Sequence, residues 1–181
     1  MVYIILGEGF EEIEALSPCD ILRRGGVEVQ LAGIGKRKVR GSHGIKVKAD
    51  IRLEDIDLDN AELVIVPGGL RGVATIEDTP AALEIVRRAY DMGLYVAAIC
   101  AGPRVLSKIG VLDGKKAVCY PGMEDQMTGN MTQESSTVVD GKIITGRAAG
   151  ASLDFAFTLL ELLKDKETAD KVRHGIHYGE K

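Results

Sequence analysis

Tryptophan is absent from the sequence, and phenylalanine and tyrosine make up only 4% of its 181 residues. Few side chains are therefore available to stack on nucleic-acid bases. The formal net charge of −4 points the same way, because proteins that bind nucleic acids usually present a basic surface to the phosphates. We expect no nucleic-acid partner.

The sequence also has no long apolar run and no regular cysteine pattern. The first apolar run, residues 2–6, is too short for a signal peptide, and none approaches the length of a transmembrane helix. The three cysteines, Cys19, Cys100 and Cys119, are too widely spaced for a disulfide framework or a zinc site. We therefore expect a cytoplasmic protein with no membrane partner and no metal.

What remains is the composition of an ordinary globular protein. The hydrophobic content is 45%, and the mean hydropathy is +0.05. A chain of this length can bury a full core as one unit. Because no repeat or linker interrupts it, we predict a single domain over residues 1–181.

Short apolar runs alternate with segments of helical periodicity. Strands are predicted at 2–6, 27–31, 63–66, 94–99 and 116–119, hairpins at 38–49 and 138–144, and helices at 11–24, 80–92, from 103 onward, at 150–163 and at 166–173. Pro18 should break the first helix. The alternation predicts an α/β fold with a mostly parallel sheet, helices on both faces, and a site beyond the carboxyl ends of the strands.

Cys100 lies where a buried strand is predicted to turn into a helix that opens at Gly102-Pro103. Such a turn lifts a side chain clear of the sheet, as in the nucleophile elbow of hydrolases. The helix N-terminus should also lower the pKa of the thiol and favour the thiolate. A small buried core residue is the alternative interpretation, because free cysteines often pack as core residues.

Three segments follow predicted parallel strands and should converge at one edge of the sheet: residues 7–14, 67–69 and 100–103. A cysteine nucleophile needs donors for the oxyanion that forms on attack. The backbone N–H groups of Gly69 and Ala101 are placed to supply them, and glycine lets a substrate approach closely. An ordinary tight loop is the alternative for Gly68 and Gly69.

Three glutamates occupy the first predicted helix. Glu11 and Glu12 fit a solvated surface near the helix N-terminus, where acids offset the helix dipole. Glu14 lies beside Ile13 and other apolar positions that mark a packed face, so its carboxyl can point inward. If it meets Cys100, one of the two groups should keep a proton, because two adjacent negative charges are costly.

Other sites are not supported. Residues 7–12 lack the third glycine of a dinucleotide fingerprint, and their acids would repel a pyrophosphate. His174 and His177 lie in a polar C-terminal segment without the His-x-Glu arrangement that a glutamine amidotransferase needs.

Four stretches together resemble the ThiJ/PfpI superfamily and, within it, the DJ-one-like protein deglycase branch. They are GFEEIE at 9–14, VPGG at 66–69, AICAGP at 98–103, and 145–150 with the helix after it. The resemblance implies a flavodoxin-like three-layer sandwich, a homodimer and no cofactor. It also implies Cys100 as an oxidisable nucleophile, Glu14 as its protonated partner, and Gly69 and Ala101 as oxyanion donors.

One position departs from that branch. Where a histidine commonly precedes the proline after the elbow strand, this chain has Tyr120. An unperturbed tyrosine, with a pKa of about 10, is a poor base near neutral pH, so Tyr120 is at most an auxiliary group. Peptidase activity is disfavoured, also because Ala101 replaces the histidine that the peptidase branch has after its nucleophile. Cys119 fits a core residue better than a second redox thiol.

The resemblance implies an enzyme acting on small 2-oxoaldehydes or on their protein adducts, of the glyoxalase or deglycase type, in the response to carbonyl or oxidative stress. Cys100 would attack the aldehyde, and Glu14 would move a proton between adjacent carbons. The alternative is a non-catalytic redox sensor or chaperone that works through oxidation of Cys100. A cysteine hydrolase of the superfamily is less favoured.

Overall fold

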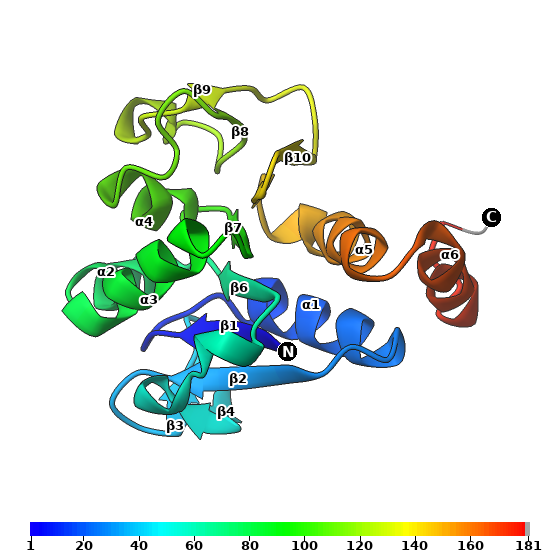
Figure 1. Cartoon of the computed structure of the whole chain (residues 1–181), viewed down its shortest axis with the longest axis horizontal. Helices are drawn as coiled ribbons and strands as arrows, with labels where there is room; N and C mark the ends of the chain where they lie inside the picture. The colour runs from blue at the N-terminus through cyan, green and yellow to red at the C-terminus, as the bar shows by residue number, and fades with distance from the viewer. Residues whose placement is uncertain (180–181) are drawn as a thin grey trace.

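The structure of the chain is a computed structural model that describes residues 1–179; Glu180 and Lys181, which end the predicted domain, lie outside the described residues. A seven-stranded sheet forms its centre, in the order β10-β11-β7-β6-β1-β2-β5 (Figure 1). Only β10 runs antiparallel to its neighbour; the other pairings are parallel. The strands are β1 (Val2–Leu6), β2 (Val29–Gly33), β5 (Ile51–Arg52), β6 (Leu63–Val66), β7 (Tyr95–Ile99), β10 (Thr137–Asp140) and β11 (Ile143–Gly146).

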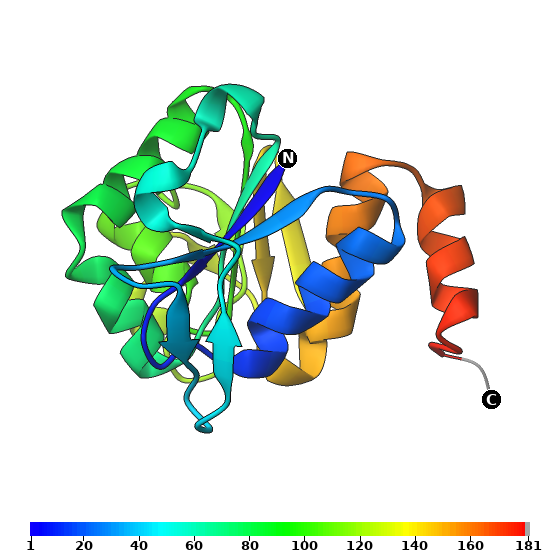
Figure 2. The same ribbon diagram turned by 90° about the horizontal axis from the view of Figure 1, so that it is seen from below.

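Helices cover both faces of this sheet, and α1 runs alongside α5 on one of them (Figures 1 and 2). They are α1 (Glu12–Arg24), α2 (Leu70–Glu77), α3 (Pro80–Asp91), α4 (Pro103–Lys108), α5 (Ser152–Leu163) and α6 (Lys166–Gly175). The predicted α/β sandwich with a mostly parallel sheet is therefore confirmed.

The continuous apolar runs of the central strands follow from this double coverage, since successive side chains face opposite sides of a sheet. Ile4 and Ile65 pack in the core formed with α1, α5 and α6. Ile5 and Val64 pack in the core formed with α2, α3 and α4. Both faces need apolar residues, so polar and apolar residues do not alternate in β1, β6 and β7.

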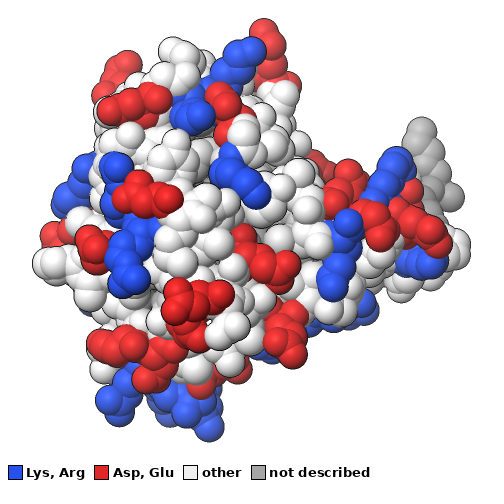
Figure 3. All heavy atoms as spheres, viewed as in Figure 1, with Lys and Arg blue, Asp and Glu red and all other residues white. Residues whose placement is uncertain are grey.

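Two small sheets lie outside the central one. β3 (Lys38–Arg40) pairs antiparallel with β4 (Lys46–Lys48), which confirms the predicted hairpin, although it forms a sheet of its own. Its basic side chains gather at the lower edge of the molecule (Figure 3). β8 (Lys116–Ala117) pairs with β9 (Asn130–Met131), so the strand predicted over 116–119 is shorter and lies outside the main sheet.

The structure differs from the sequence analysis at two helices. α1 continues through Pro18 without a break: Pro18 is buried, and the packing of the whole helix, which lies against α5, outweighs one lost backbone hydrogen bond. α2, which begins directly after Gly69, was not predicted, because the sequence analysis assigned no element to residues 70–77. No helix within residues 1–179 is long and apolar enough to span a bilayer.

Candidate functional site

The carboxyl ends of β1, β6 and β7 meet at one edge of the sheet, as the sequence predicts. The loop after β1 is tied to the loop after β6 by a hydrogen bond from the Glu11 N–H to the Gly68 carbonyl, at 3.0 Å. Cys100 follows β7 directly and donates its N–H to the Gly146 carbonyl at 2.9 Å. The loops after β1 and β6 are therefore joined to each other, and the turn after β7 is fixed to the end of β11.

Cys100 has a backbone conformation that is rare for a side chain with a Cβ. Its φ is +64°, in the left-handed region. Such a conformation is strained in non-glycine residues and is found often at functional sites. The turn leaves the side chain partly exposed, between β7 and α4.

Glu14 is fully buried at 0% exposure, on the side of α1 that faces the cysteine. Its Oε2 accepts a hydrogen bond from the Gly68 N–H at 2.8 Å. The Cys100 thiol interacts with the same carboxyl group, but Oε1 has no hydrogen bond of regular geometry from any described residue. This oxygen keeps unused bonding capacity.

Both groups have raised pKa values. Burial raises the pKa of Glu14 to about 7, although bonds from Cys100 and Gly68 act in the opposite direction. Burial and the negative charge of Glu14 raise the pKa of Cys100 to about 12. The pair therefore carries one proton and one negative charge over a wide range that starts near neutral pH.

The sequence predicts that the α4 N-terminus lowers the pKa of the Cys100 thiol. This prediction is wrong: the net effect of the surroundings is to raise that pKa. Backbone N–H groups of Ala101 and Gly69 do lower the pKa of Cys100, but burial and the carboxylate outweigh them. These two N–H groups are the ones proposed from the sequence as oxyanion donors. Gly69 has a φ of +84°, and a Cβ there would lie 2.6 Å from the Gly9 carbonyl oxygen.

Gly68 separates the two reactive groups and leaves no room for a methyl group. A Cβ on Gly68 would lie 2.4 Å from Glu14 Oε2 and 2.8 Å from Cys100 Cβ. We predict that Gly68→Ala lowers the free energy of unfolding by about 1–3 kcal/mol and slows alkylation of Cys100 by iodoacetamide.

Urea unfolding and peptide mass spectrometry measure the two effects. Gly150→Ala is the matched control, because nothing lies within 4 Å of its added methyl group. Unchanged alkylation in Gly68→Ala would show that the contact between Glu14 and Cys100 does not govern thiol reactivity.

Cys100 opens into a cavity of about 510 Å³. Tyr120 lines it and is 49% exposed; its N–H donates to the Cys100 carbonyl at 2.9 Å. A second cavity, of about 790 Å³, shares Glu11, Gly69 and Leu70 with the first. A small substrate can therefore reach the sulfur, and a larger one can extend past Leu70.

Two expectations for the first helix are wrong. Glu12 is only 4% exposed, because its carboxylate binds the turn between β3 and β4, which sequence spacing does not place near it. Ile13 is 54% exposed, so it is not part of the packed face.

Glu11, Glu12 and His43 form the one cluster among residues 1–179 whose ligand atoms could surround a metal ion, all within 4.8 Å of one another. Their polar atoms already bond to each other and to Ser42. These hydrogen bonds account for the cluster without a metal.

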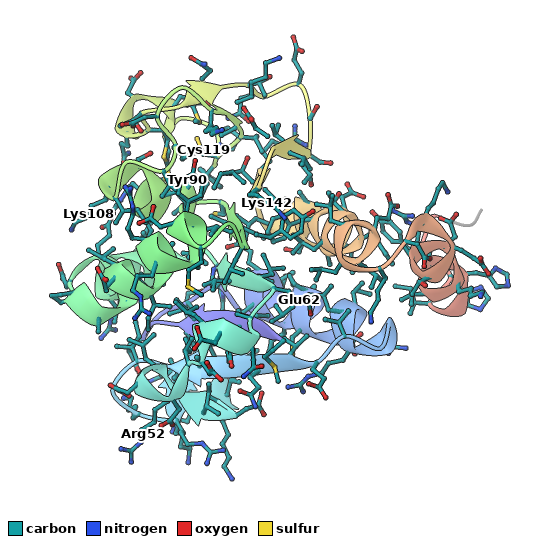
Figure 4. All side chains as sticks on the ribbon, viewed as in Figure 1. Arg52, Glu62, Tyr90, Lys108, Cys119 and Lys142 are labelled. Atoms are coloured by element: carbon teal, nitrogen blue, oxygen red, sulfur yellow. The ribbon has the colours of Figure 1, made fainter. Side chains whose placement is uncertain are left out.

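Cys119 is completely buried beyond the end of β8 (Figure 4). Burial raises the pKa of its thiol to about 11, and the thiol donates to the Tyr120 carbonyl at 3.5 Å. This is the environment of a core residue, the interpretation that the sequence favoured.

Known proteins resemble this chain over almost its whole length. The family model described as "DJ-1/PfpI family" matches residues 1–162. The chain is 35% identical over 176 residues to "Protein dj-1beta" of Drosophila melanogaster, covering 96% of this chain and 94% of the relative.

Two further relatives carry names that describe an activity. A protein of Pyrococcus abyssi named as a deglycase is 32% identical over 165 residues, covering 90% of this chain and 99% of the relative. A "Glutathione-independent glyoxalase" of Caenorhabditis elegans is 29% identical over 167 residues, covering 91% and 89%. Among solved structures, "Toxoplasma gondii DJ-1, oxidized" has a TM-score of 0.93 and 36% identity, covering 98% of each chain.

Proposed function

This chain belongs to the DJ-1/PfpI family, and from that premise we propose that it is a cofactor-independent cysteine enzyme of the glyoxalase or deglycase type. Its substrates would be small 2-oxoaldehydes, such as methylglyoxal, or their adducts on proteins. Relatives named as a deglycase and as a glutathione-independent glyoxalase support this class of substrate. The role would be protection against carbonyl or oxidative stress.

One observation carries the proposal: a fully buried carboxyl with a pKa of about 7 lies against a partly exposed cysteine at a strained turn. A carboxyl with that pKa can both give and take a proton near neutral pH. A thiolate beside it can attack a carbonyl carbon. The arrangement therefore supplies a nucleophile and a proton carrier without any cofactor.

The first step would be transfer of the Cys100 thiol proton to Glu14 and addition of the resulting thiolate to the aldehyde carbon. A C–S bond forms, and the carbonyl electron pair moves to oxygen, where the Gly69 and Ala101 N–H groups stabilise the negative charge. Glu14 then gives its proton to that oxygen. The product is a hemithioacetal with Glu14 as a carboxylate.

The carboxylate would next remove the hydrogen, as a proton, from the former aldehyde carbon and return it to the adjacent carbon through an enediol. The hydroxyl proton of the hemithioacetal passes to the oxygen of that adjacent carbon. The first carbon is thereby oxidised to a thioester and the second is reduced to an alcohol, so no external oxidant is needed. Water, deprotonated by Glu14, attacks the thioester and releases a 2-hydroxy acid. Thiolate and protonated Glu14 are restored.

The direct test is to incubate the purified protein with methylglyoxal, without glutathione, and to follow the 2-hydroxy acid lactate. The proposal predicts catalytic turnover with an intact, reduced Cys100. Absence of lactate, with Cys100 shown to be reduced by mass spectrometry, would refute the enzymatic role.

A redox sensor or chaperone is the second candidate. The related Toxoplasma gondii structure is described as oxidized, which favours an oxidisable centre in this family. A peroxide would transfer one oxygen to the Cys100 thiolate and leave as water or alcohol, and a second peroxide would give the sulfinate. Ready oxidation of Cys100 in a protein without turnover would support this role. A cysteine hydrolase is the least favoured, with Ala101 and Tyr120 where the peptidase and deglycase branches have histidines.

We also propose that the protein is a homodimer. Ile13 and Ile45 are both exposed, and the segments that carry them are joined by the bond from the Ile45 N–H to Glu12. This apolar pair would be covered by a second copy; light scattering should report twice the monomer mass, and a monomer would contradict the proposal. A cytoplasmic location and the absence of membrane and nucleic-acid partners stay predictions of the composition.

A further inference from the structure

Glu12 is a buried carboxylate outside the cysteine pair. Its Oε1 accepts hydrogen bonds from the His43 N–H at 2.9 Å and the Ile45 N–H at 3.3 Å. Its Oε2 accepts from the Ser42 hydroxyl at 3.1 Å and lies 3.1 Å from His43 Nδ1. All of these partners belong to the turn at residues 41–45, between β3 and β4. The carboxylate is thus bonded along the whole turn.

The same turn is tied to the loop at residues 9–11, at the start of α1 (Figure 2). The Gly9 N–H donates to the Arg40 carbonyl, and the Ser42 N–H donates to the Phe10 carbonyl, both at 2.8 Å. Turn and loop therefore hold each other through backbone bonds, with Glu12 fixing the turn.

The loop in turn holds the segment that carries the oxyanion donor. The Glu11 N–H donates to the Gly68 carbonyl at 3.0 Å, and the Gly72 N–H donates to the Gly9 carbonyl at 3.1 Å. These two bonds bracket Gly69, whose N–H faces the Cys100 sulfur. A continuous chain of hydrogen bonds thus runs from the Glu12 carboxylate to the cysteine.

Close packing leaves these hydrogen-bonded segments little room to move. A Cβ on Gly41 would lie 2.3 Å from Glu12 Oε1, and a Cβ on Gly69 would lie 2.6 Å from the Gly9 oxygen. A Cβ on Gly72 would lie 2.6 Å from the Phe10 Cα. The 41–45 turn, the 9–11 loop and the segment around Gly69 are thus in direct contact. A displacement of the turn should therefore also displace the loop and Gly69.

We propose that Glu12 is a positioning residue for the Cys100 site. By holding the 41–45 turn against the 9–11 loop, it fixes the Gly69 N–H that faces the sulfur and the Glu11 side chain that lines both cavities. Its effect on turnover rests on the proposed function, but its effect on thiol reactivity does not. Glu12 touches neither Cys100 nor the 510 Å³ cavity that holds it.

Two replacements of Glu12 separate acceptor geometry from other effects. Glutamine keeps an oxygen for the His43 and Ile45 N–H groups, whereas alanine removes it. In Glu12→Ala we expect iodoacetamide to react with Cys100 at least about tenfold more slowly at neutral pH, with kcat for methylglyoxal falling similarly and KM changing less. In Glu12→Gln both rates should stay within roughly threefold of the wild type.

The pH profile of alkylation is the readout that a loss of stability alone would not move. The groups facing the sulfur, Glu14, Glu11, Arg104 and Tyr120, are unchanged in both variants. We expect the midpoint in Glu12→Ala to move upward by roughly one pH unit, because a displaced Gly69 N–H stabilises the thiolate less.

Gly41→Ala tests the same contact from the opposite side, should Glu12→Ala fail to fold. Its methyl group would push directly on the Glu12 carboxylate, and we expect the same slower alkylation. Gly175→Ala, with nothing within 4 Å of the added methyl, is the matched control and should behave as wild type.

Wild-type alkylation in folded Glu12→Ala, or in Gly41→Ala, would overturn the proposal. A loss in Glu12→Gln as large as in Glu12→Ala would overturn it too, since the charge and not the acceptor would then matter. A wild-type protein without turnover would refute the proposed function, and the alkylation experiment would still decide the role of Glu12.

Discussion

Cys100→Ala should abolish the conversion of methylglyoxal to lactate, lowering kcat/KM by on the order of 10³-fold or more. Every step of the proposed reaction passes through a bond to the Cys100 sulfur. No second thiol can replace it, because both other cysteines, Cys19 and Cys119, are buried and neither lines the cavity into which Cys100 opens. Steady-state kinetics with lactate detection measures the loss.

Cys119→Ala is the control for thiol removal as such and should retain turnover. Both alanine variants should fold, since each deletes one sulfur atom and leaves the backbone of its turn unchanged. Turnover within tenfold of wild type in folded Cys100→Ala would mean that another residue is the nucleophile.

Glu14→Gln should lower kcat by roughly 10²-fold to 10⁴-fold, the range expected when a positioned acid and base is removed. Glutamine fills the same volume and can still bond the Gly68 N–H, but it cannot carry a proton between two carbons. Turnover should fall even though Cys100 remains present and reduced. A glutamine variant that retains wild-type kcat would exclude Glu14 as the proton carrier.

The same variant should change how stability depends on pH. Burial raises the pKa of Glu14 from 4.5 to about 7, so the unfolded chain releases its proton before the folded protein does. Wild-type stability should therefore fall as pH rises through this interval, by about 2 kcal/mol between about pH 5 and about pH 8. Glu14→Gln lacks this loss, which urea unfolding at the two pH values would show.

Much of the fold could be predicted because its signals are local. The runs at 2–6, 63–66 and 95–99 are apolar throughout, as strands buried on both faces must be. The convergence of the Cys100 turn with the loop after β6 followed from parallel strand order alone. The inward direction of Glu14 was predicted correctly, although Ile13, one of the residues used to infer it, faces outward.

Other features depend on contacts that no local pattern encodes. Glu12 was assigned to the surface because its burial is due to a turn about thirty residues further along the chain. The unbroken helix through Pro18 depends on its packing against α5. The thiol pKa was predicted from the helix N-terminus, whereas burial and the Glu14 charge dominate it.

The central claim is that Cys100 and Glu14 share one proton, and that transfer of the thiol proton to the Glu14 carboxylate makes the thiolate available near neutral pH. The rate of Cys100 alkylation by iodoacetamide, followed from about pH 5 to about pH 10 by peptide mass spectrometry, tests it directly. The account predicts a midpoint at or below about pH 7, the value at which the pair loses its first proton, and an upward displacement in Glu14→Ala. A wild-type rate that rises only above about pH 8.5, as for an ordinary thiol or later, would show that Glu14 does not help to form the thiolate and would contradict this claim.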